Sequence, residues 1–144
     1  MTGGYMKITS KWLEDRGACL DGKNWFKAQE ENNGVKIIEK LINENQSDWA
    51  NWLVVRLMPT HKMKIQYAVF AAEQVIDIFE KKYPDDKRPR QAIEAAKAYI
   101  EDPSGENRNA AAYAAHAADA AHAAEGELKT KIIKYGIKLL KDNI

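Results

Sequence analysis

The stretch HKMKIQYAVFAAEQVIDIFEKKY, residues 61–83, decides the fold class, because its apolar side chains recur with the period of an α-helix. On a helical wheel one side carries Ile65, Ala68, Val69, Ala72, Val75, Ile76 and Phe79. That side is widened by Tyr67, Ala71 and Ile78, and the opposite side carries Gln66, Glu73, Asp77 and Glu80. Pro84 ends the segment. The pattern predicts one long amphipathic helix.

Start and stop signals on either side of this stretch predict further helices. Thr9 or Ser10 caps a short helix that Gly17 ends, and Ser47 caps a helix over residues 48–58. Helices are also expected over residues 34–45 and 88–102. Residues 21–33 are rich in turn formers and predict a loop with one helical turn.

The last segment, residues 105–142, is expected to be one long helix or two. Its residues 110–124 include 11 alanines, and alanine has the highest helix propensity. Gly126 separates this tract from a conventional amphipathic part, so a kink or break is predicted there. The expected fold is all-α: a single-domain bundle or short superhelix of five to seven helices over residues 1–144, with the alanine-rich segment near its C-terminal end. Met6 offers an alternative start, in which case residues 1–5 would be a tag.

Composition narrows the possible partners. Lys plus Arg is 22 and Asp plus Glu is 21, so the balanced charge disfavours a non-specific nucleic-acid binder. No apolar run is long enough for a membrane span and no signal region is evident, so a cytoplasmic protein is expected.

A lone cysteine, Cys19, forms no intrachain disulfide. It is interpreted as a small buried residue after the end of a short helix.

No catalytic or metal-binding constellation is recognisable. His116 and His122 are six residues apart, which does not place them on one helix face as the i, i+4 histidines of zinc sites are placed. The chain has neither a glycine-rich phosphate loop nor a nucleophile elbow. We therefore expect no metal, no cofactor and no enzyme activity.

The candidate partner-binding residues form three groups. Glu73, Asp77 and Glu80 form an acidic stripe on the predicted outer face of residues 61–83, interpreted first as solvated. Arg88 and Arg90 belong to a basic cluster, in which Arg90 is expected to pair with Glu94 at i, i+4. Polar groups on the alanine-rich segment are Tyr113, His116 and Asp119, which are also where an undiagnosed enzyme site would lie.

Four tryptophans occur within the first 52 residues, namely Trp12, Trp25, Trp49 and Trp52. Aromatic side chains bury large areas, so an aromatic-rich N-terminal core is the preferred interpretation. An exposed tryptophan would instead be a candidate for a binding hot spot.

Several short blocks, taken in order, resemble a known family. They are Lys7-Ile8-Thr9, Trp12-Leu13, Gly17-Ala18-Cys19, Gly22, Trp25-Phe26, Asp48-Trp49, Trp52-Leu53, residues 88–96 (RPRQAIEAA), and Pro103-Ser104 before the alanine-rich tract. This arrangement, over residues 7–124, is similar to bacterial and phage proteins labelled putative immunity proteins. The Arg-Pro-Arg block followed by the tract is its most specific part.

The resemblance implies an intracellular helical antidote that binds another protein, a cognate toxin, without catalysis. Two alternatives stay open: a phage-encoded inhibitor of a host defence protein, and a structural or virion-associated helical protein. Neither the partner nor the oligomeric state follows from the sequence.

Overall fold

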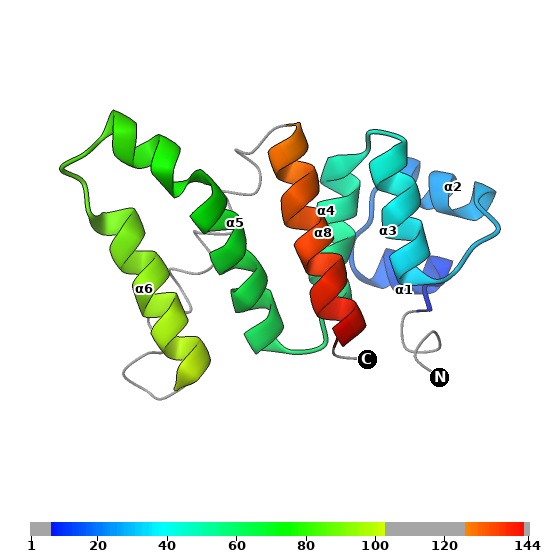
Figure 1. Cartoon of the computed structure of the whole chain (residues 1–144). Coiled ribbons are helices and arrows are strands. Elements are labelled where there is room, and N and C mark those ends of the chain that lie inside the picture. Colours follow the sequence, from blue (N-terminus) through cyan, green and yellow to red (C-terminus); the bar gives the residue numbers. More distant parts are fainter. Residues whose placement is uncertain (1–6, 103–125, 143–144) are drawn as a thin grey trace. The chain divides into compact units, whose positions relative to one another are not determined.

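A computed structural model of the chain describes residues 7–102 and 126–142, in which the all-α prediction is confirmed (Figure 1). The alanine-rich tract, with Tyr113, His116 and Asp119, lies outside the described residues. Seven helices are described: α1 (Ser10–Asp15), α2 (Leu20–Ala28), α3 (Gly34–Asn43), α4 (Ser47–Leu57), α5 (His61–Lys82), α6 (Arg88–Glu101) and α8 (Glu127–Asp142).

The chain divides into two compact units. One contains Met1–Met58 and Gly136–Ile144, and the other contains Pro59–Tyr135. Within the first unit α1 packs on α2 and α3 packs on α4; within the second α5 packs on α6 (Figure 1). The prediction of a single domain over residues 1–144 stays a prediction.

Polar caps set the predicted helix ends in the first unit. The Thr9 hydroxyl accepts a hydrogen bond from the Trp12 amide at 3.0 Å and begins α1. Gly17, with φ +77°, ends this helix: its amide donates to the Glu14 carbonyl, and the next amide donates to the Leu13 carbonyl. This bonding pattern is a Schellman motif. The predicted stop at Gly17 is therefore confirmed.

Three local predictions in this unit are wrong. Residues 21–33, expected to form a loop with a single turn, contain most of α2, because the Cys19 sulfur accepts a hydrogen bond from the Gly22 amide and caps a nine-residue helix. Cys19 is accordingly exposed and at a helix N-terminus, not buried beyond a helix end. Helix α4 begins at Ser47 with Gln46 as its cap residue, so the Ser47 side chain does not cap it.

Aliphatic side chains form the core of the α3–α4 pair. Ile38 and Val54 are fully buried, and Ile37, Leu41 and Leu53 are nearly so. Burying a side chain of this size stabilises a fold by about 1.5–3 kcal/mol. The apolar spacing of α3 therefore accounts for its position in the core.

All four tryptophans are half-buried, which corrects the expected aromatic core. The Arg16 guanidinium lies 4.1 Å from the Trp12 ring centre and donates to the Trp12 carbonyl. Arg56 makes the same two interactions with Trp52, also at 4.1 Å. The Trp12 and Trp52 rings therefore each have one face against the arginine four residues later and are not fully enclosed in the core.

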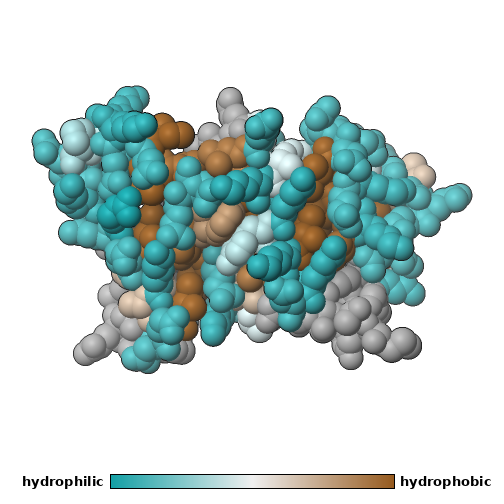
Figure 2. All heavy atoms as spheres, in the orientation of Figure 1, coloured by the Kyte–Doolittle hydropathy of each residue, from teal (hydrophilic) through white to brown (hydrophobic). Residues whose placement is uncertain are grey.

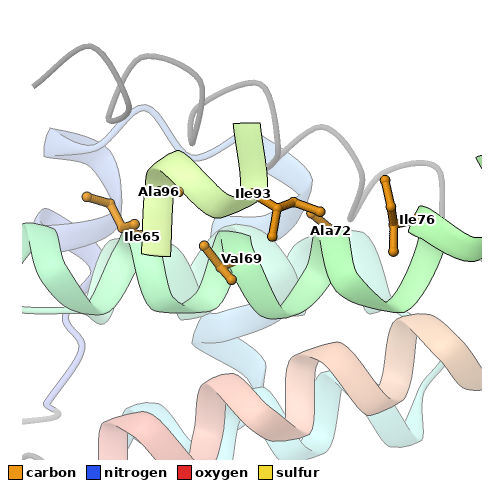
Figure 3. Close-up of a cluster of buried hydrophobic side chains, with 6 residues drawn as sticks. All are labelled: Ile65, Val69, Ala72, Ile76, Ile93 and Ala96. Carbon is orange, nitrogen blue, oxygen red and sulfur yellow. The ribbon is translucent and has the colours of Figure 1, made fainter. Parts of the chain in front are cut away.

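In the second unit a small apolar cluster joins α5 to α6. Figure 3 shows its side chains meeting between the two helices: Ile65, Val69, Ala72 and Ile76 from α5, and Ile93 and Ala96 from α6. Figure 2 shows apolar atoms between these helices and hydrophilic side chains around them. The Phe70 ring also stacks on the Tyr135 ring at 4.0 Å between ring centres.

Two further predictions concern α5 and the start of α8. Ile78, expected to widen the apolar side of α5, is 65% exposed because α6 packs on the side that carries Ile76. Gly126 has φ +61°, which an α-helix does not allow, and α8 starts at the next residue. The predicted break at Gly126 is confirmed.

Candidate partner-binding surface

The acidic stripe of α5 faces basic side chains of α6. Arg90 donates two hydrogen bonds to the Glu80 carboxylate, from Nε at 2.7 Å and from Nη2 at 2.6 Å. This bidentate geometry is the strongest form of an arginine–carboxylate contact. Asp77 lies farther away, with its Oδ1 3.9 Å from Arg90 Nη2. The expected pairing of Arg90 with Glu94 is therefore wrong, because Arg90 reaches across to α5.

A second cross-helix pair lies two turns away. The Lys97 ammonium is 2.7 Å from the Glu73 carboxylate, and both side chains are more than a third exposed. The pKa of Lys97 is raised from its ordinary value, chiefly by its hydrogen bond with Glu73. We call Glu73, Asp77, Glu80, Arg90 and Lys97 the charged seam. Of the acidic stripe expected to be solvated, Asp77 is 82% exposed, whereas Glu73 and Glu80 are paired with side chains of α6.

Hydrogen bonding dominates the electrostatics of the seam. The pKa of Glu80 is lowered from its ordinary value, first by the hydrogen bond with Arg90 and further by the charges of Arg90 and Lys87, against an opposing effect of burial. The pKa of Arg90 is raised, mainly by the same hydrogen bond. Glu80 and Arg90 therefore both stay ionised at neutral pH, and this pair of the seam consists of two opposite charges.

Arg88 belongs to a separate pair at the turn before α6. Its guanidinium donates to both Asp86 oxygens, at 2.9 and 2.7 Å, and its amide donates to Asp86 Oδ1 at 3.0 Å. These hydrogen bonds lower the pKa of Asp86 to about 2, and the side-chain hydrogen bond with Arg88 has the largest effect. A carboxylate at a helix N-terminus is also favoured by the helix dipole. The pair fixes the turn between the two helices.

The sequence-predicted candidates are thus only partly brought together. Glu73, Asp77, Glu80 and Arg90 share the seam, whereas Arg88 pairs within the turn. Lys97 and Asp86 were missed. A signal for Lys97 exists, since Glu73 and Glu80 are seven residues apart on α5 and Arg90 and Lys97 are seven apart on α6. In both pairs the residue numbers, 73 with 97 and 80 with 90, add up to 170, as expected for antiparallel helices.

Within residues 7–102 and 126–142, no group of three or more His, Cys, Asp or Glu side chains is placed to hold a metal ion. In the same part of the chain, no helix has both the length and the apolar character needed to cross a bilayer. Exposed apolar side chains also occur on this unit, at Ile78 and Tyr83.

Comparison with known protein families gives a match. The family model described as Imm-5 like putative immunity protein matches residues 58–135, which is 78 of the 144 residues and contains both α5 and α6. Residues 7–57, which carry the tryptophan blocks of the resemblance, precede the matched region. Neither a curated protein nor a solved structure matches the chain.

Proposed function

Because the chain belongs to the Imm-5 like putative immunity protein family, we propose that it is a non-catalytic antidote that neutralises a cognate toxin by stoichiometric binding. The family match carries this proposal. It covers the unit in which α5 and α6 pack against each other as a helical hairpin. Binding takes place in the cytoplasm. It requires only a surface that keeps its shape, and no turnover.

The α5–α6 hairpin supports a role in recognition in two ways. Its apolar cluster and the seam pairs hold the helices together, so little conformational entropy remains to be lost on binding. Its exposed side chains include the charged groups of the seam, such as Asp77 and Arg90, together with Arg88. We propose that Glu73, Asp77, Glu80, Arg88 and Arg90 contribute to the toxin interface, and that Tyr113, His116 and Asp119 extend it.

The test is affinity capture from the native host, followed by titration of the captured protein's activity. An antidote gives inhibition that saturates at a fixed molar ratio, with no chemical change in the target. Capture of a host defence protein would instead indicate a phage-type inhibitor, and capture of virion proteins without any inhibition would indicate a structural role. Turnover of a small molecule by the purified chain, lost in the His116→Ala or Asp119→Asn variant, would overturn the proposal.

A further inference from the structure

The turn between α5 and α6 carries exposed apolar side chains. Three large apolar side chains are exposed among the described residues, and two of them, Ile78 at 65% and Tyr83 at 48%, lie within six residues of each other. The third, Leu20 at 67%, is on α2. A single exposed apolar residue is ordinary, whereas two at the same end of a helical hairpin, Ile78 in the last part of α5 and Tyr83 just after it, suggest a contact surface.

Basic side chains surround this apolar pair. Lys81 and Lys82 follow Ile78 by three and four residues, so they lie beside it on α5. The Lys82 ammonium is 5.5 Å from the centre of the Tyr83 ring. Residues 78–88 hold four basic and three acidic side chains, a surplus of one positive charge, and the acidic Glu80 is paired with Arg90 of α6. We call residues 78–88 the hairpin tip.

The hairpin tip is held in one conformation by its own contacts. The Tyr83 amide donates to the Phe79 carbonyl at 2.8 Å, and the Asp86 amide donates to the Tyr83 carbonyl at 3.2 Å. The Phe79 ring lies 5.1 Å from the Tyr83 ring. The bidentate Asp86–Arg88 pair closes the turn. Ile78 and Tyr83 are therefore presented without a large ordering cost, which favours tight binding.

These observations define the surface that fits the tip. An apolar side chain and a tyrosine ring bind best in a pocket that removes them from water, and tyrosine is enriched among binding hot spots. The surplus of positive charge requires carboxylates at the rim of that pocket, which also speed association. A bilayer with anionic lipids is less favoured, because the family match implies a protein as the target.

We propose that the hairpin tip inserts Ile78 and Tyr83 into an apolar pocket rimmed by carboxylates on the inhibited protein. This inference rests on the proposed function and names the chemistry of its partner. The tip then makes the central contact, and the charged seam contributes polar contacts beside it.

The experiment uses the full chain and, as probe, the purified protein that the wild-type chain captures and inhibits. Ile78→Asp and Tyr83→Ala should each weaken binding at least about tenfold, mainly through faster dissociation. The double variant Lys81→Glu/Lys82→Glu should slow association and reduce its dependence on salt. Leu20→Asp, which changes an equally exposed side chain on α2, is the matched control and should bind like the wild type.

The possible outcomes distinguish the role of the hairpin tip from the antidote role itself. Unchanged circular dichroism and melting temperature in the tip variants, with weakened binding, support the tip. If the wild type inhibits its target and all variants bind that target with equal affinity, the proposed role of the hairpin tip is wrong, and the antidote role stands. Absence of any stoichiometric target overturns both. Binding to vesicles of three parts phosphatidylcholine and one part phosphatidylglycerol, lost in Ile78→Asp, would replace the protein pocket with a membrane surface.

Discussion

The α3–α4 and α5–α6 pairs are both helical hairpins, yet they are held together differently. α3 and α4 bury large aliphatic side chains, with Ile38 and Val54 fully enclosed. α6 buries only Ile93 and Ala96, and the seam pairs Arg90–Glu80 and Lys97–Glu73 supplement this small cluster. The first hairpin is therefore specified by apolar burial. The second hairpin depends partly on ion pairs, and the side chains that form these pairs stay at the surface.

The largest expected effect is on the aliphatic hairpin. Ile38→Ala should lower the free energy of unfolding by about 2–5 kcal/mol, because it removes a fully buried side chain and leaves a cavity. The matched change on the second hairpin, Ile78→Ala, should alter it by no more than about 0.5 kcal/mol, because that side chain is exposed. Urea denaturation followed by circular dichroism measures both. Equal losses would break the comparison.

The next effect concerns the backbone of the first unit. Gly17→Ala should cost about 1–2 kcal/mol, because residue 17 has φ +77° and alanine is strained there even though an added Cβ meets no atom within 4 Å. Gly22→Ala should stabilise the chain by about 0.5–1 kcal/mol, because residue 22 is inside α2 and the added Cβ makes an ordinary 3.4 Å contact with the Cys19 sulfur. Melting temperatures that shift in opposite directions would confirm both.

A smaller effect tests the charges of the second hairpin. The pKa of Glu80 is lowered in the folded chain, so its pairing stabilises the fold above its ordinary value of 4.5 and is lost as the pH falls through the lowered value. Glu80→Gln should therefore melt below the wild type at pH 7, and the difference should vanish in acid. Glu39→Gln, at an exposed position on α3, serves as the control. A difference that persists at low pH would show that packing, and not charge, is responsible.

The smallest effect is expected at Cys19. Its thiol is exposed, so one equivalent of a disulfide reagent such as dithiobisnitrobenzoate should react in native buffer. Cys19→Ser should change the free energy of unfolding by less than about 0.5 kcal/mol, because serine is itself a preferred cap residue. A thiol that reacts only in denaturant would contradict the cap position.

Sequence patterns predicted most helices because start and stop signals act locally. Thr9 and Gly17 lie next to the ends that they determine. Helix α2 was missed because cysteine is not a usual cap residue. The charged seam was missed for another reason: a helical wheel shows which residues share a side, but not which helix will cover that side. The mirrored seven-residue spacing on α5 and α6 contained this information once the two helices were treated as antiparallel.

The clustering of the tryptophans has a consequence for spectroscopy. All four are in the first unit, and Pro59–Tyr135 contains none, so the second unit carries only tyrosine as a phenolic fluorophore. Emission excited at wavelengths that tyrosine does not absorb reports on the first unit alone. Two-state unfolding requires different probes to give coincident transitions. Tryptophan fluorescence therefore follows the unfolding of the first unit alone. Comparing it with circular dichroism, which reports on both units, tests in the unmodified chain whether the two units unfold together.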